Sequence, residues 1–226
     1  MGEFETLTVG DTTTKQYVAG DATPGTPGVV VLHAWWGLND DIAAFADRLA
    51  GAGFAVVAPD LYGDGHVAMT IEDAERSARA ADQAEDAVNA IVLAAIDRLI
   101  ERLGSTSRLA VLGFSFGAHW TMWSPTQHDQ VVASILYYGT TDGEVLTESS
   151  VPVLGHFAEH DPYETTEWVD EFEGTLRSAG RDVEIHRYPD TGHWFAEPSR
   201  DAYRPEAADL AFDRTVTFLR KHFDAG

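Results

Sequence analysis

The sequence predicts an α/β fold, in which a mostly parallel sheet carries helices on both faces. Three observations predict it. Short apolar runs alternate along the chain with longer segments of helical periodicity, which is the pattern of strands joined by crossover helices. Most of the apolar runs lack polar alternation, as strands buried on both faces do. No repeat, linker or block of charge marks a second domain, so we expect residues 1–226 to form a single domain.

Strands are expected where short runs of β-branched and apolar residues lie between turn residues. The first two runs flank a turn and predict an antiparallel hairpin at one edge of the sheet. This hairpin and a loop rich in Pro and Gly fill residues 1–28. In chain order, the strands are expected at residues 4–9, 15–19, 29–32, 54–58, 109–112, 131–138, 151–157 and 183–188.

Helices are expected between these strands. Asp40 or Asp41 is expected to cap the first helix, which ends at Gly51 or Gly53. A further helix follows the glycine-containing motif at 113–117. Others are expected from Thr70 (which with Asp73 resembles a capping box) to Gly104, over 164–179 with Trp168, Phe172 and Leu176 on one face, and over 207–223.

The composition excludes several classes of function. Asp and Glu number 37 against 15 Lys and Arg, which gives a formal net charge of -22. Such a field repels nucleic acid and anionic membranes, so we expect neither as a partner. Lys15 and Lys221 are the only lysines, and this favours adaptation to high salt slightly over a merely acidic enzyme.

The absence of cysteine excludes disulfides, thiol catalysis and thiolate metal sites. The N-terminus lacks the pattern of a signal peptide, and no apolar run is long enough to span a bilayer. We therefore expect a cytoplasmic protein. A monomer and a small homo-oligomer both stay open.

The functional hypothesis centres on Gly113-Phe114-Ser115-Phe116-Gly117, a G-x-S-x-G motif between a predicted strand and a predicted helix. In that context the motif is typical of a nucleophile elbow. The glycines permit a sharp turn that projects the hydroxyl of Ser115. The backbone N–H of Phe116 would then stand at a helix N-terminus, where an oxyanion is stabilised. A chance Gly-Ser turn is the structural alternative.

The acid and the base are sought at the ends of later strands, because ligands of parallel sheets bind beyond the carboxyl ends of the strands. Asp161 follows the strand at 151–157, and His193 follows the strand at 183–188. The order Ser115, Asp161, His193 is that of hydrolases with this elbow. Asp142, after the strand at 131–138, is the reserve acid. An Asp161 that only caps a helix and a His193 without a partner are the structural alternatives.

His156 and His160 are four residues apart, but they lie at a strand end and are expected to diverge rather than to bind a metal. No metal and no cofactor is therefore expected. His33 is expected either to line the pocket or to pack as a core residue. The aromatic residues near the motifs are candidates for the substrate pocket, although some belong to the core: Trp36, Trp194 and Phe195.

Five motifs together resemble the dienelactone hydrolase family of α/β-hydrolases. They are H-A-W-W-G-L-N at His33–Asn39, P-D-L-Y at Pro59–Tyr62, G-F-S-F-G at Gly113–Gly117, A-E-H-D at Ala158–Asp161 and G-H-W-F at Gly192–Phe195. The resemblance covers nearly the whole chain from Val29 onward. It implies a compact α/β-hydrolase fold without a large cap domain, hydrolysis of an ester or lactone, and a second oxyanion donor in the backbone N–H of Trp35.

Three positions depart from the best-known members of this family. Those members carry cysteine at Ser115, glutamate at Ala34 and arginine at the position that here falls on Glu197. The loss of the arginine argues against a small dianionic substrate, and a substrate carboxylate is expected to meet the negative charge of Glu197 near His193. If Trp35, Trp36 and Trp194 face the pocket, neutral or aromatic acyl groups are preferred.

The sequence therefore predicts a serine hydrolase that cleaves small-molecule carboxylic esters or lactones through an acyl-enzyme on Ser115. Two alternatives stay open. One is a true dienelactone (carboxymethylenebutenolide) hydrolase. The other is a family member that has lost catalysis and binds a ligand or partner.

Overall fold

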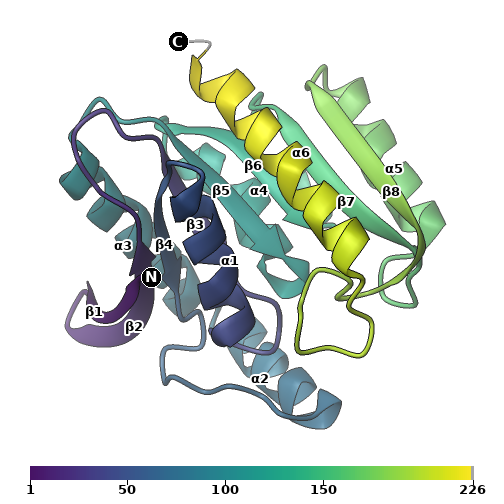
Figure 1. Cartoon of the computed structure of the whole chain (residues 1–226), viewed down its shortest axis with the longest axis horizontal. Coiled ribbons are helices and arrows are strands. Elements are labelled where there is room, and N and C mark those ends of the chain that lie inside the picture. The colour runs from purple at the N-terminus through teal and green to yellow at the C-terminus, as the bar shows by residue number, and fades with distance from the viewer. Residues whose placement is uncertain (225–226) are drawn as a thin grey trace. The chain divides into compact units, whose positions relative to one another are not determined.

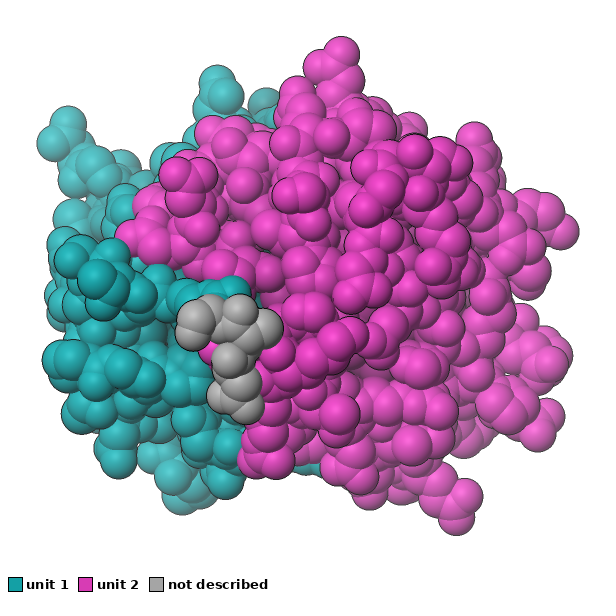
Figure 2. Space-filling view, turned by 90° about the horizontal axis from the view of Figure 1, so that it is seen from above, with its two compact units in different colours: residues 1–111 teal, residues 112–226 magenta. Residues whose placement is uncertain are grey.

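The computed structural model describes the backbone of residues 1–224 and the side chains of residues 1–223. It confirms the predicted fold class, because eight strands form one mostly parallel sheet in the order β1-β2-β4-β3-β5-β6-β7-β8 (Figure 1). By compactness the chain divides into two units, residues 1–111 and 112–226, coloured teal and magenta in Figure 2. That residues 1–226 form one domain stays a prediction. Within residues 1–224, no helix combines the length and the apolar composition needed to cross a bilayer.

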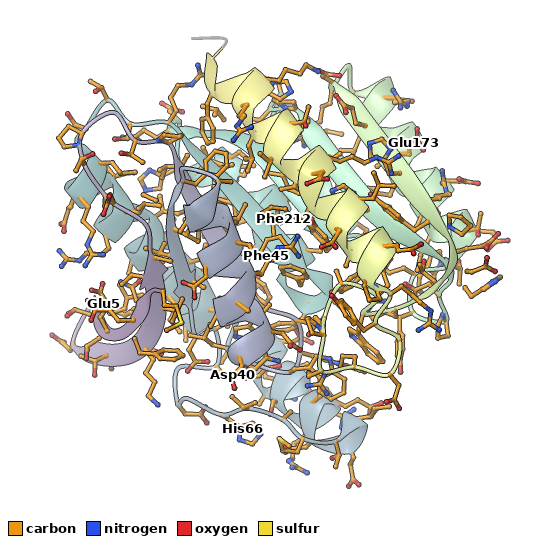
Figure 3. The ribbon with its side chains drawn as sticks, in the orientation of Figure 1. Glu5, Asp40, Phe45, His66, Glu173 and Phe212 are labelled. Atoms are coloured by element: carbon orange, nitrogen blue, oxygen red, sulfur yellow. The ribbon has the colours of Figure 1, made fainter. Side chains whose placement is uncertain are left out.

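The strands of the first unit are β1 (Glu3–Val9), β2 (Thr12–Ala19), β3 (Gly28–Leu32) and β4 (Ala55–Pro59), and β5 (Leu109–Phe114) runs into the second unit. β1 and β2 form the predicted antiparallel hairpin, which turns at Gly10, where φ is +57°. β2 also pairs antiparallel with β4, and β3 pairs parallel with β4. Arg102 extends from the long helix of this unit to the carboxylate of Glu5 on β1, at 2.6 Å (Figure 3).

Three helices accompany these strands: α1 (Asp40–Gly51), α2 (Ile71–Gln83) and α3 (Glu85–Leu103). α1 lies in front of the strands in Figure 1 and α3 behind them. The predicted cap of α1 was wrong by one residue, because Asn39 Oδ1 accepts from the N–H of Ile42. Asp40 and Asp41 occupy the first turn instead, where their charge complements the helix dipole. Thr70 caps α2 as predicted, but the helical region breaks at Ala84.

The second unit holds β6 (Val131–Tyr137), β7 (Val153–His160), β8 (Val183–Gly192), α4 (Ala118–Gln127), α5 (Thr166–Ser178) and α6 (Pro205–Asp224). β6, β7 and β8 pair in parallel. α6 lies in front of this part of the sheet in Figure 1, and α4 and α5 lie behind it. The buried core behind the sheet joins α4, α5 and the strands; it includes Met122, Leu136, Phe157 and Phe172.

One predicted helix face was wrong in part. Trp168 was expected on the same face of α5 as Phe172 and Leu176, but Trp168 is 56% exposed whereas the other two are buried. The buried stripe is Val169, Phe172 and Leu176, at the i, i+3, i+7 spacing of a helix face. Glu173 of α5 forms an ion pair with Arg187 of β8, at 3.7 Å (Figure 3).

A cluster of buried polar side chains lies on the other face of the sheet, beneath α6. The ring nitrogens of His156 on β7 are bonded to the hydroxyls of Tyr188 and Thr215, at 2.8 and 3.0 Å. Burial lowers the pKa of His156 well below its usual value, and the charges of His186 and Arg214 lower it further. His156 is therefore held neutral inside the fold.

Candidate active site

Ser115 directly follows β5, at a sharp turn into α4. Its φ is +44°, in the left-handed region that a residue with a side chain rarely adopts. Such a conformation costs about 1–3 kcal/mol, so the surrounding structure must hold it in place. At two neighbouring positions the chain packs so closely on this turn that only glycine fits. A Cβ at Gly113 would lie 2.2 Å from Thr121 Oγ1, and a Cβ at Gly139 would lie 2.6 Å from the carbonyl oxygen of Ser115.

Asp161 and His193 are the first residues after β7 and β8. These strands are parallel neighbours, and their last paired residues are His160 and Gly192. The register shifts between Ala158 and His160, which is a bulge-type irregularity of the kind that re-aims side chains near active sites. Asp161 and His193 consequently leave the sheet side by side.

Three side chains form a continuous chain of hydrogen bonds. Ser115 Oγ lies 2.8 Å from His193 Nε2, and His193 Nδ1 lies 2.7 Å from Asp161 Oδ2. The other oxygen, Asp161 Oδ1, accepts from the backbone N–H groups of Tyr163 and Glu164, at 2.9 and 3.0 Å. The side chains of His193 and Asp161 are only 4% and 1% exposed. Since both carboxylate oxygens are occupied, the orientation of Asp161 is fixed.

Aromatic rings surround the imidazole of His193. The centroids of Tyr138, Tyr163 and Trp194 lie 5.1, 5.0 and 4.9 Å from it. Tyr138 and Trp194 also have positive φ angles, +39° and +67°. Tyr163 is 37% exposed and was not singled out from the sequence. Its place two residues after Asp161, in the loop beyond a strand, is the signal that could have identified it.

Glu164 is a second site residue that the sequence analysis missed. Its two carboxylate oxygens accept from the N–H and the hydroxyl of Thr140, in the loop after β6, at 3.1 and 2.6 Å. Burial raises the pKa of the Glu164 carboxyl, while the hydrogen bonds from Thr140 and the charge of His193 act in the opposite direction. A cavity of about 490 Å³ adjoins this loop, and its lining includes Thr140, Asp142 and Trp168.

Two expectations for the segment after His193 were wrong. Phe195 was expected to line the pocket, but it is fully buried and packs on Tyr138 and Tyr188, with ring centroids 5.4 and 5.0 Å away. Glu197 was expected to face a substrate carboxylate, but it is 1% exposed and accepts a hydrogen bond from the Tyr138 hydroxyl at 3.0 Å. The tight turn from Gly192 to Glu197 directs both side chains inward.

Three candidate residues lie in the first unit. His33 is buried; its Nδ1 is 2.7 Å from the carbonyl oxygen of Ala34, and its Nε2 accepts from the N–H of Leu61 at 3.0 Å. This bonding matches the packing alternative for His33. The carbonyl of Trp35 accepts from the hydroxyl of Tyr62 at 2.7 Å. Trp36 is 4% exposed and meets the ring of Trp35 edge to face, at 5.7 Å.

The remaining candidates fall outside this cluster. Asp142, the reserve acid, is exposed, and the carboxylate bonded to His193 Nδ1 is that of Asp161. His156 is buried whereas His160 is exposed, so the two diverge as expected. Among the residues that the structure describes, one group of three potential metal ligands occurs, Glu159, His160 and Asp190. All three are exposed, an arrangement that is common without an ion.

Comparison with known proteins places these features in a family. Residues 14–223 match the dienelactone hydrolase family. Protein usf of Aquifex pyrophilus is 32% identical over 212 residues, which cover 89% of this chain and 91% of that protein. A probable 2-oxo-3-(5-oxofuran-2-ylidene)propanoate lactonase of Bradyrhizobium sp is 27% identical over 210 residues, covering 87% and 84%.

The fold is likewise shared with solved structures. A dienelactone hydrolase-like promiscuous phosphotriesterase from metagenomic libraries superposes with a TM-score of 0.84 at 20% identity, over 98% of both chains. At that identity the likeness shows the fold alone. The match over residues 14–223 shows the family. This protein belongs to the dienelactone hydrolase family and is an ester or lactone hydrolase with the α/β-hydrolase fold.

Proposed function

We propose that this protein cleaves carboxylic esters or lactones through an acyl-enzyme formed on Ser115. The observation that best supports the proposal is the pair of hydrogen bonds joining Ser115 Oγ, the two ring nitrogens of His193 and Asp161 Oδ2, at 2.8 and 2.7 Å. A serine hydroxyl is a poor nucleophile until a base removes its proton, and an imidazole needs a carboxylate to fix its tautomer. This arrangement meets both needs.

The reaction follows from these positions. His193 Nε2 takes the proton of Ser115 as Oγ attacks the substrate carbonyl carbon, and it then returns the proton to the departing alkoxide oxygen. A water molecule attacks the acyl-enzyme in the same way, which releases the acid and restores Ser115. Asp161 keeps the hydrogen on Nδ1 and stabilises the imidazolium that forms in each half of the cycle.

The oxyanion of each tetrahedral intermediate requires hydrogen-bond donors that are already in place. The backbone N–H of Phe116 is one proposed donor, because it belongs to the turn from which α4 begins, where the helix dipole favours negative charge. The second proposed donor, the N–H of Trp35, rests on the family resemblance.

The substrate class is inferred from the walls beside His193. Tyr163 and Trp194 contact its ring, and their own centroids are 5.3 Å apart. Such walls suit neutral or aromatic groups, through apolar contact and stacking. Two relatives are named as a lactonase (Bradyrhizobium sp) and as a carboxymethylenebutenolidase (Yersinia pestis). A dienelactone therefore belongs among the substrates of the same assay.

The test is ester and lactone hydrolysis by wild-type protein and by Ser115→Ala. Loss of a triad nucleophile lowers kcat by a factor on the order of 10⁶. The variant removes one hydroxyl, so its thermal unfolding should match that of the wild type. A folded variant that keeps more than about a tenth of the activity would overturn the proposal, and a wild-type protein inactive on all substrates would favour the binding alternative.

A further inference from the structure

Glu164 is a partly buried carboxylate to which the proposed mechanism assigns no task. It lies between Asp161 and the start of α5, yet it is not the cap of that helix. Thr165 fills that position, since its side chain accepts from the N–H of Trp168 at 3.3 Å. The Glu164 carboxylate is directed instead to Thr140, whose N–H and hydroxyl both donate to it.

These contacts close a ring around the proposed triad. Ser115 bonds to His193, His193 to Asp161, and Asp161 Oδ1 to the N–H of Glu164. The Glu164 side chain then bonds to Thr140. Thr140 follows Gly139, which packs so closely on Ser115 that a Cβ there would lie 2.6 Å from the serine carbonyl oxygen. The loop that carries the acid is thereby tied to the loop that packs on the nucleophile.

We propose that Glu164 is a positioning residue of this active site, which clamps the loop after β6 to the loop of Asp161 and so sets the alignment of Ser115, His193 and Asp161. The inference rests on the proposed function. Glu164 contacts no reacting atom; it acts through the Thr140 hydrogen bonds and through its own N–H to Asp161. Neither loop is regular secondary structure, so their spacing depends on such side-chain ties.

Three variants separate the hydrogen bonds of Glu164 from its charge. Glu164→Ala removes both hydrogen bonds and the charge. Glu164→Gln keeps an acceptor for the Thr140 N–H and offers an amide donor to its hydroxyl, but it removes the charge. Glu167→Gln is the matched control, because Glu167 is an exposed glutamate in the first turn of α5.

For Glu164→Ala we expect kcat to fall about tenfold or more while KM stays within about threefold, since misplaced catalytic groups lower the rate of chemistry rather than binding. Glu164→Gln should recover kcat to within about threefold, because its amide keeps an acceptor for the Thr140 N–H. Glu167→Gln should match the wild type in both kcat and KM.

A purely structural Glu164 would behave differently. Its alanine variant would unfold at a lower temperature but keep wild-type kcat; that result overturns the proposal. If Glu164→Ala does not fold, Thr140→Val takes its place, because it removes the 2.6 Å hydrogen bond and should lower kcat without changing KM. Unchanged kcat in Thr140→Val is then the contradicting result.

The two levels of inference fail in different ways. Ser115→Ala is measured first. If it remains active, the proposed function fails whatever the Glu164 variants do. If it is inactive while all Glu164 and Thr140 variants match the wild type, the nucleophile stands and only the clamp is refuted.

Discussion

Asp161→Asn should disable the enzyme by reversing the tautomer of His193. The asparagine has one acceptor oxygen and one NH₂ group where Asp161 has two acceptors. Two backbone N–H groups, of Tyr163 and Glu164, point at the position of Oδ1. The amide oxygen must stay there, because turning the amide over would leave both N–H groups facing an NH₂ in a side chain that is 1% exposed.

The cost of that turned amide sets the expected magnitude. Two lost hydrogen bonds amount to about 2 kcal/mol or more, a preference of about thirtyfold for oxygen at the Oδ1 position. The NH₂ group then donates to His193 Nδ1, the ring hydrogen moves to Nε2, and His193 cannot accept the proton of Ser115. A reversed tautomer elsewhere costs about 10⁴ in kcat, or about 5.4 kcal/mol in the barrier.

The assay is kcat for a p-nitrophenyl ester, measured for Asp161→Asn and for Asp142→Asn, with circular dichroism to verify folding. Asp142 is the control because it is an exposed carboxylate of the neighbouring loop. We expect Asp142→Asn to stay within about twofold of the wild type, since exposed charges interact weakly. The reasoning is refuted if Asp161→Asn keeps more than about a tenth of the activity, or if Asp142→Asn is the more damaged variant.

Three further predictions concern stability and specificity. Burial lowers the folded-state pKa of His156, so its contribution to stability is complete above the unfolded pKa of 6.5 and is lost as pH falls below it, by up to about 1.4 kcal/mol per pH unit. His156→Asn should therefore flatten the fall in Tm between about pH 7.5 and about pH 5.5 relative to the wild type, and parallel curves would contradict this. The protein carries a net charge of -22, so Tm should rise as the KCl concentration is increased from about 0.05 to about 3 M and the self-repulsion is screened. A flat or falling Tm would contradict the adaptation to high salt. Because Glu197 is buried and no arginine occupies its position, a substrate carboxylate would lose its hydration beside aromatic rings without gaining a charge-assisted bond. A neutral ester should therefore exceed a matched carboxylated one by about tenfold in kcat/KM, and preference for the carboxylated member would point to another basic group.

The sequence was most informative where backbone periodicity and chain order carry the signal. Ser115, Asp161 and His193 each follow a strand directly, and the parallel pairing of β7 with β8 brings two of them together. Residue types at strand ends therefore indicate the candidate site from the sequence alone. Strand ends were less certain, because β7 and β8 extend three and four residues beyond the expected ends at Phe157 and Tyr188.

Side-chain direction in loops was beyond reach of the sequence. Phe195 and Glu197 lie two and four residues after His193, and residues at such positions can face either the pocket or the core. Only the turn between Gly192 and Glu197 shows that both side chains point into the core. The bond between Glu164 and Thr140 joins residues 24 positions apart, with no periodicity to mark it. Such contacts depend on the packing of two loops.

Two predictions about helices, the face of α5 and the continuity of the helical region from Thr70 to Gly104, were wrong for local reasons. Trp168 and Val169 both fit an apolar stripe with Phe172 and Leu176, at i, i+4, i+8 and i, i+3, i+7 respectively, so spacing alone does not choose between them. The break at Ala84 carries no Gly or Pro, the residues that usually announce one. Alanine favours a continuous helix, and tertiary packing overrides that weak preference.

The most direct measurement of the central claim is the mass of the intact protein after exposure to a fluorophosphonate, a reagent that reacts covalently with activated serines. We predict a single adduct in the wild type, located on Ser115 by fragmentation, and no adduct in Ser115→Ala. His193→Ala should also escape labelling, because the serine then has no base. An unlabelled wild type, an adduct at another residue, or equal labelling of Ser115→Ala would contradict the assignment of Ser115 as the nucleophile.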